Sequence, residues 1–271
     1  MHPIERLRYV ARASGAEQAV LVRETAQALA AFRDDPQGLV TACRRIVARQ
    51  PSCGALWWLS ARTLAATDPM VEAWKAADEI EEDGTARELS HALPEGGPVV
   101  VIGWPELAGQ ALARRGDVEA LVVDTFHEGS GLVRRLLQGD ADAVDVPVAG
   151  LGAAVADADS SVLLEASAVG PTAFVGVSGR GAGRARDRRH AGVPVWLVAG
   201  VGRLLPARMW EALELRFDVS DPWDADDEVR AAVDPRSTGW RRHGASGRWT
   251  RDSGPPTVPS LPSCSGSRDP R

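Results

Sequence analysis

The feature that most constrains this 271-residue chain is a series of short apolar runs between residues 98 and 198, separated by stretches that can form helices. Strands that are apolar on both faces are typical of a parallel sheet covered by helices. Right-handed crossovers then predict an α/β fold with a Rossmann-like open parallel sheet. The predicted strands are Val99–Ile102, Ala120–Val123, Ala143–Val146, Val162–Leu164 and Val193–Val198.

The segments between these strands predict crossover helices at 106–115, 132–137, 150–156 and 182–190. In open parallel sheets, ligands bind just outside the carboxyl ends of the strands. The loops in which to look for a site are therefore those at 103–105, 124–131, 147–152, 165–170 and 199–203.

Residues 1–95 show helical periodicity only, so we expect an N-terminal helical subdomain ahead of a Rossmann-like domain at 96–230. Asp68 before Pro69 predicts a helix start, because the carboxylate can accept from unpaired amides and proline loses no bond there. Thr85 and Glu88 predict a capping box at the next helix. Cys43 falls on an apolar helix face, so we expect it in the core.

The last 41 residues, 231–271, differ sharply in composition from the rest of the chain. They contain seven arginines against three aspartates, and 25 of them are Gly, Pro, Ser or Arg. A segment this poor in apolar residues cannot offset the entropy of ordering, so it predicts a disordered basic tail. The abrupt change also suggests a hypothesis that this ending is truncated or out of frame, which sequencing the gene would test.

Charge and cysteine content exclude several functional classes. The net charge of −6 gives no reason to expect a nucleic-acid partner. No apolar run approaches the roughly 18 residues that cross a bilayer, so we expect no membrane partner and a cytoplasmic location. The three cysteines, Cys43, Cys53 and Cys264, are scattered without metal-ligand spacing. We predict neither a metal nor a cofactor.

The segment Val162–Val198 begins V-L-L-E-A-S-A-V-G-P and ends with H-A-G-V-P-V-W-L-V. It resembles the initiation factor 2B alpha/beta/delta subunit family, which is related to the methylthioribose-1-phosphate and ribose-1,5-bisphosphate isomerases. The family's Gly-Ala-Asp strand end falls on Glu165-Ala166-Ser167, and its Glu-Gly pair on Glu128-Gly129. The resemblance also implies a helical subdomain followed by a Rossmann-like domain.

The resemblance implies that the family's isomerases use a cysteine and an aspartate to move protons. In this chain Ser167 stands at the aspartate position, and the cysteine position falls near Ile102 or Gly103. We therefore predict no catalytic residues and a divergent, non-catalytic member of the family.

The strongest candidate for ligand binding is Gly129-Ser130-Gly131, which lies between a predicted strand and a predicted helix. Unpaired amides at a helix start attract anions, although an ordinary tight turn would have the same sequence. The predicted ligand-binding residues all come from loops at strand ends. They are Trp104, Asp124, Glu128, Gly129, Ser130, Gly131, Glu165 and Ser167.

Three functions remain open at this point. The first is a non-catalytic binding or regulatory protein, expected to be a homodimer, that recognises a phosphorylated sugar or nucleotide at the strand ends. The second is a sugar-phosphate aldose-ketose isomerase-like enzyme with a substituted active site, using Glu128, Asp124 or Glu165. The third is a structural module that binds a partner protein.

Overall fold

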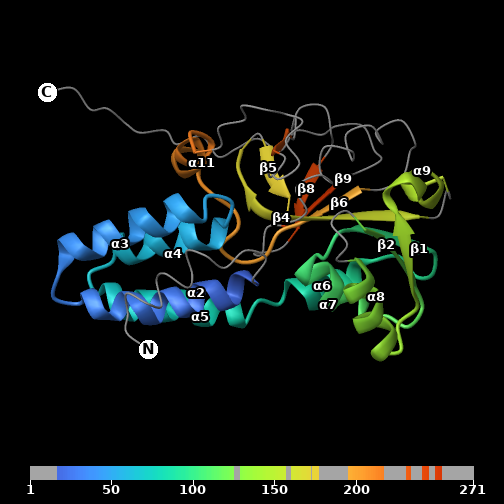
Figure 1. The fold of residues 1–271 in the computed structure, drawn as a ribbon, viewed down its shortest axis with the longest axis horizontal. Helices are drawn as coiled ribbons and strands as arrows, with labels where there is room; N and C mark the ends of the chain where they lie inside the picture. Colours follow the sequence, from blue (N-terminus) through green and yellow to red (C-terminus); the bar gives the residue numbers. More distant parts are fainter. Residues whose placement is uncertain are drawn as a thin grey trace, which may run out of the picture.

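The computed structural model shows a helical bundle beside a covered sheet (Figure 1). The described residues are 17–124, 129–156, 160–171, 173–176 and 195–216, together with the strands at 230–232, 240–243 and 248–251. Within these ranges, no helix is both long and apolar enough to cross a bilayer.

Four helices and a short 3₁₀ turn form the N-terminal bundle. They are α2 (Gln18–Leu29), η1 (Ala30–Phe32), α3 (Pro36–Arg49), α4 (Gly54–Ala65) and α5 (Pro69–Glu81). Their shared core contains Leu21, Leu29, Ile46, Leu56 and Ile80. Cys43 is buried in the same cluster, so its predicted core position is confirmed. The expectation of helices in this part of the chain is met from Gln18 onward.

The predicted helix start at Asp68 is confirmed, because its carboxylate accepts from the amides of Met70 and Val71 at 3.1 and 3.2 Å. The predicted capping box at α6 (Thr85–Ala92) is wrong. The amide of Thr85 donates to Asp83 Oδ1 at 2.8 Å, while the Thr85 hydroxyl is buried without a partner. Asp83 caps this helix instead, because its carboxylate, two residues before Thr85, accepts from the first amide of the helix.

The central sheet has five parallel strands in the order β3-β2-β1-β4-β6. These are β1 (Pro98–Ile102), β2 (Glu119–Asp124), β3 (Ala143–Pro147), β4 (Ser161–Val169) and β6 (Val195–Val198). The predicted Rossmann-like parallel sheet is therefore confirmed. The helices between and after these strands are α7 (Glu106–Leu112), α8 (Gly129–Gln138), α9 (Leu151–Ala154), preceded by η2 (Val148–Gly150), and α11 (Ala207–Glu214).

Both faces of the central strand β1 are apolar, as its uniform apolar run predicts. Val99 and Val101 of β1 pack with α6, α7 and α8 on one face, where Figure 1 shows these three helices grouped together. Val100 and Ile102 pack on the other face with Leu151 of α9. By its packing, α6 thus lies with the sheet, although the predicted subdomain boundary near residue 95 comes after it.

The fourth strand is longer than predicted, and the expected loop at 165–170 is wrong over Glu165–Val169. A following strand, β5 (Ala173–Gly176), pairs antiparallel with this extension and supplies the hydrogen bonds that keep it extended. Glu165 and Ser167 consequently lie within a buried strand rather than in a loop. The predicted helix at 182–190 lies outside the described residues.

Three short strands lie at 230–251, largely in the segment whose composition predicts disorder. They are β7 (Arg230–Ala232), β8 (Trp240–His243) and β9 (Arg248–Arg251). β9 pairs with β6 in antiparallel orientation and β8 pairs with β9, while the disorder of the tail as a whole stays a prediction. An average over 41 residues hides short runs that can pair with the open edge of a sheet. The other residues of the predicted tail lie outside the described ranges.

Candidate functional site

Three of the predicted ligand-binding residues meet where β1 and β2 end. Gly103 has a φ of 70°, which turns the chain after β1 and brings Trp104 to the start of α8. A methyl group on Gly131 would lie 2.3 Å from Cζ3 of Trp104, so the indole packs directly on the helix backbone and requires glycine there. Trp104 is 38% exposed and Ser130 is exposed, which leaves this corner accessible.

Two more of these residues flank the same corner. Asp124 is the last residue of β2, and Gly129 is the first residue of α8. The first amides of a helix have no partner within the helix and attract negative charge. Glu128 lies outside the described residues.

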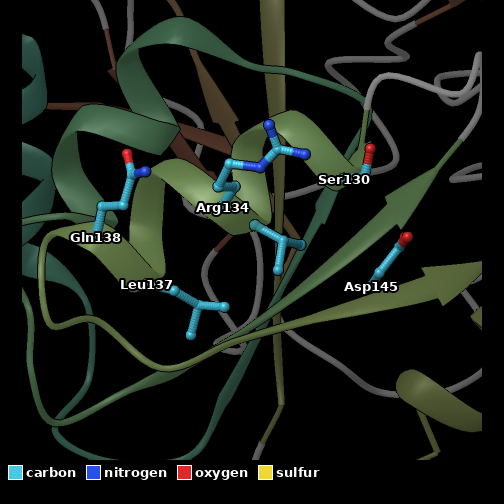
Figure 2. Close-up of a pocket in the computed structure, with 6 residues that line it drawn as sticks. Ser130, Arg134, Leu137, Gln138 and Asp145 are labelled. Carbon is cyan, nitrogen blue, oxygen red and sulfur yellow. The ribbon is translucent and has the colours of Figure 1, made fainter.

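A shallow depression of about 430 Å³ continues from this corner along α8 (Figure 2). Its lining residues are Ser130, Val133, Arg134, Leu137 and Gln138 of α8, and Asp145 of β3. Arg134 lines the depression one turn after Ser130 and carries a positive charge.

Glu165 does not join that corner and has its own partners inside the protein. Its Oε2 accepts from the amides of Leu107 and Ala108, at 2.7 and 3.0 Å, at the start of α7. Its Oε1 accepts from Arg203 Nη1 at 2.7 Å. Both carboxylate oxygens are engaged, so Glu165 occupies helix amides that could otherwise hold a ligand.

Arg203 joins a second carboxylate to this group. Its Nη1 also donates to the carbonyl of Ala166 at 3.1 Å, and its Nη2 lies 3.4 Å from Glu106 Oε2. We call Glu106, Glu165 and Arg203 the junction network. Burial lowers the pKa of Arg203, but the adjacent carboxylates of Glu165 and Glu106 more than offset this, so its pKa is raised.

Glu106 is the member of the junction network with a perturbed acidity. Burial raises its pKa to about 7, and the negative charges of Glu165 and Glu17 act in the same direction. The guanidinium of Arg203 and a hydrogen bond from the backbone of Gln18 oppose that rise. Glu106 is therefore partly protonated near neutral pH.

The bundle meets the sheet around the junction network. Gln18, the first residue of α2, donates from Nε2 to the carbonyl of Ser167 at 3.2 Å. The hydroxyl of Ser167 donates to the carbonyl of Val175 at 3.2 Å. Asp83 Oδ2 accepts from the amide of Val201, after β6, at 2.9 Å. Ser167 thus contacts backbone groups and lies in the packed junction.

Sequence reasoning missed Arg203 and Glu106. Arg203 falls in a loop that the strand pattern does select, at 199–203, and Glu106 opens a predicted helix. A usable signal was present: Glu165 interrupts an apolar strand, and a buried charge needs a partner of opposite charge.

The described residues contain no group of three or more His, Cys, Asp or Glu side chains placed to hold a metal ion. Cys43 and Cys53 are both buried and are not joined in a disulfide. Burial raises the pKa of Cys43 to about 11, so it is a thiol at neutral pH. Cys264 lies outside the described residues.

Several known structures have a similar fold. The translation initiation factor eIF-2B of Pyrococcus horikoshii OT3 is 15% identical with a TM-score of 0.66, over 76% of this chain and 80% of that chain. A chain of the tetrameric eIF2B-beta2-delta2 complex from C. thermophilum is 17% identical with a TM-score of 0.59, over 75% and 77%.

The 5-methylthioribose 1-phosphate isomerase of Pyrococcus horikoshii OT3 is also similar, at 15% identity and a TM-score of 0.54, over 74% of this chain and 68% of that chain. No protein-family model and no curated protein sequence matches this chain. The predicted resemblance to the initiation factor 2B and isomerase group is therefore confirmed at the level of the fold.

Proposed function

We propose that this protein is a non-catalytic binding or regulatory protein with the initiation factor 2B fold, and that it recognises a phosphorylated sugar or nucleotide where β1 and β2 end. The observation that carries the non-catalytic part is the engagement of Glu165, whose two oxygens bind Arg203 and the start of α7. A general base must reach the proton that it removes. Glu165 is committed to the protein itself.

The proposed ligand site is the corner formed by Trp104, Gly129, Ser130 and Gly131. Helix amides and the positive charge of Arg134 favour a phosphate group there. The partly exposed indole of Trp104 adds an apolar surface for a sugar or a base. Asp124 and Glu128 border this corner in sequence, and their part in binding stays a prediction.

The proposal includes self-association and a cytoplasmic location. Support for self-association comes from the fold, because one of the similar structures is a tetrameric complex. Glu106, with a pKa near 7, is the group best suited to proton transfer, and it supports the alternative of a substituted isomerase-like enzyme. The alternative of a structural partner-binding module gains support only if no ligand binds.

A thermal-shift screen of sugar phosphates and nucleotides tests the ligand site, because a ligand that binds only the folded state raises Tm. We expect one phosphorylated compound to raise the Tm of the full chain. Ser130→Asp places a negative charge at the start of α8, which repels the phosphate. The affinity of this variant for the ligand should fall at least tenfold, and the rise in Tm should shrink accordingly. Ser130→Asn adds similar bulk without charge and should keep the shift.

The possible results separate the three functions. A shift that is equal in Ser130→Asp and in the unchanged protein rejects this corner as the site. No shift across the panel, with a cooperative melting transition, favours the partner-binding module. Turnover of a bound sugar phosphate favours the isomerase-like enzyme. Loss of that turnover in Glu106→Gln would then identify Glu106 as the group that transfers the proton.

A further inference from the structure

Polar contacts join the bundle to the sheet at the starts of α2 and α4. Gln18 of α2 donates to the carbonyl of Ser167 in β4, and its Oε1 accepts from the amide of Ala55 at 3.4 Å. Gly54, the first residue of α4, lies so close to β4 that a methyl group on it would be 2.7 Å from the carbonyl oxygen of Ser167. The bundle therefore covers the carboxyl end of β4.

Glu106 lies between these two parts of the molecule. On the sheet side, its carboxylate faces the guanidinium of Arg203 at 3.4 Å and the negative charge of Glu165. On the bundle side, it accepts a hydrogen bond from the backbone of Gln18, and the carboxylate of Glu17 acts on it as a like charge. A change of charge on Glu106 therefore alters contacts on both sides of the junction.

The charges of the junction network do not balance. Arg203 brings one positive charge, whereas Glu165 and Glu106 bring two negative charges when both are ionised. Other titratable groups face this network from the elements packed around it. They are Glu17 before α2, Cys53 at the N-cap of α4, and Asp83 before α6, which borders Gly200 as Arg203 does. These groups supply no second positive charge, so a proton on Glu106 removes the imbalance.

We propose that Glu106 is a pH-sensitive contact between the bundle and the sheet: its protonated form closes the junction, and loss of the proton lets the bundle separate locally from the carboxyl end of β4. An ionised Glu106 in the closed junction meets the like charges of Glu165 and Glu17 with little solvent to screen them. Separation admits water, which stabilises the ionised form. Opening and proton loss therefore favour each other, and opening exposes Glu165 and Arg203, which the closed junction buries.

The direction of the pH effect follows from the two states of Glu106. In the closed junction its pKa is raised from 4.5 to about 7, and in the open junction water returns the pKa toward 4.5. The closed state is therefore favoured below pH 4.5 and loses that advantage as pH rises through 7. The equilibrium constant for opening should rise about tenfold or more between pH 5 and pH 8.

Hydrogen exchange on the full chain tests this inference, because the ratio of the observed to the intrinsic exchange rate gives the opening constant at each amide. The amides to follow are that of Gln18, which binds Glu106, and that of Val201, which packs on the bundle core and binds Asp83. Both opening constants should rise with pH. Both amides should also exchange faster than those of β1, which is paired on both sides and opens only on global unfolding.

Two variants separate the charge of Glu106 from other effects of pH. In Glu106→Gln the side chain keeps its shape but has no proton to lose, so the opening constants at Gln18 and Val201 should not change between pH 5 and pH 8. Glu211→Gln makes the same change of charge at an exposed position of α11. Its opening constants should rise with pH as in the unchanged protein.

Three results overturn the inference. The first is an opening constant at Gln18 and Val201 that does not change with pH in the unchanged protein, or that rises equally in Glu106→Gln. The second is loss of the rise in Glu211→Gln, which would make the effect one of net charge. The third is exchange at these amides as slow as in β1 at every pH, because the junction then opens only when the whole protein unfolds. The measurement uses no ligand, so the thermal-shift screen is read separately.

Discussion

Glu165 lies at a predicted strand end, where the sequence predicts ligand binding, but its side chain is buried and binds other parts of the protein. Its side chain and that of Arg203 are both almost fully buried, and they are 2.7 Å apart. A buried ion pair gains little over an apolar replacement, but removal of one partner leaves an uncompensated charge. The arginine would then retain only Glu106, at 3.4 Å, as a carboxylate partner.

Glu165→Gln should therefore lower the free energy of unfolding by about 3 kcal/mol, the low end of what breaking a buried pair costs. Urea denaturation at neutral pH measures this loss. The matched control is Glu81→Gln, which removes one of the two carboxylate partners of Arg23 in an exposed pair and should cost at most about 1 kcal/mol. Equal losses in the two variants would show that Glu165 is not a buried, committed charge.

At the scale of elements, α6 connects the bundle to the sheet through its cap. Asp83 accepts from the amide of Thr85 with one oxygen and from the amide of Val201 with the other, at 2.8 and 2.9 Å. One carboxylate thus begins a helix and holds the loop after β6. Thr85, the residue that the local pattern selects as the cap, is buried with an unpaired hydroxyl.

Asp83→Ala should cost about 2 kcal/mol, because a helix cap and a bond to a charged acceptor are lost together. Asp68→Ala removes a cap that lacks a second long-range bond and should cost about 1 kcal/mol. Thr85→Val should be neutral or stabilising, since it removes a buried hydroxyl without a partner. Urea unfolding of the three variants checks the order. A large loss in Thr85→Val would restore threonine as the cap.

At the scale of the whole molecule, the junction network makes stability depend on pH. The pKa of Glu106 rises from 4.5 to about 7 on folding, so the folded state holds the proton more tightly. Stability from this group is therefore present below pH 4.5 and is lost as pH rises toward 7. Glu106 is 16% exposed, so solvent screens the effect only in part.

The unchanged protein should lose stability relative to Glu106→Gln between pH 4.5 and 8. The expected loss is up to about 3 kcal/mol, from about 1.4 kcal/mol for each pKa unit. Urea unfolding of both proteins at intervals of one pH unit measures the difference, in which the titration of other groups cancels. Glu211→Gln, at an exposed position, is the control and should show no such slope. A difference that is constant with pH would place the pKa of Glu106 near its ordinary value.

Much of the architecture could be predicted from sequence, because it depends on local patterns. Uniform apolar runs predicted the five parallel strands, and aspartate before proline predicted the start of α5. These signals work since side-chain burial repeats with the period of the element, and capping involves residues two or three apart. The meeting of Trp104 with Gly131 also follows from one rule, that parallel strands end at the same edge.

The amino-acid sequence by itself determined the order of the elements, the sheet and the corner where β1 and β2 end. Only the tertiary structure decided that Glu165 binds Arg203, that Asp83 holds Val201, and that β4 continues through Ser167. Each of those contacts or extensions depends on pairing with a segment outside the local pattern, and the two side-chain bonds join residues 38 and 118 positions apart. Period and capping signals act over a few residues, whereas the partner of a buried charge is chosen by the packing of the whole chain.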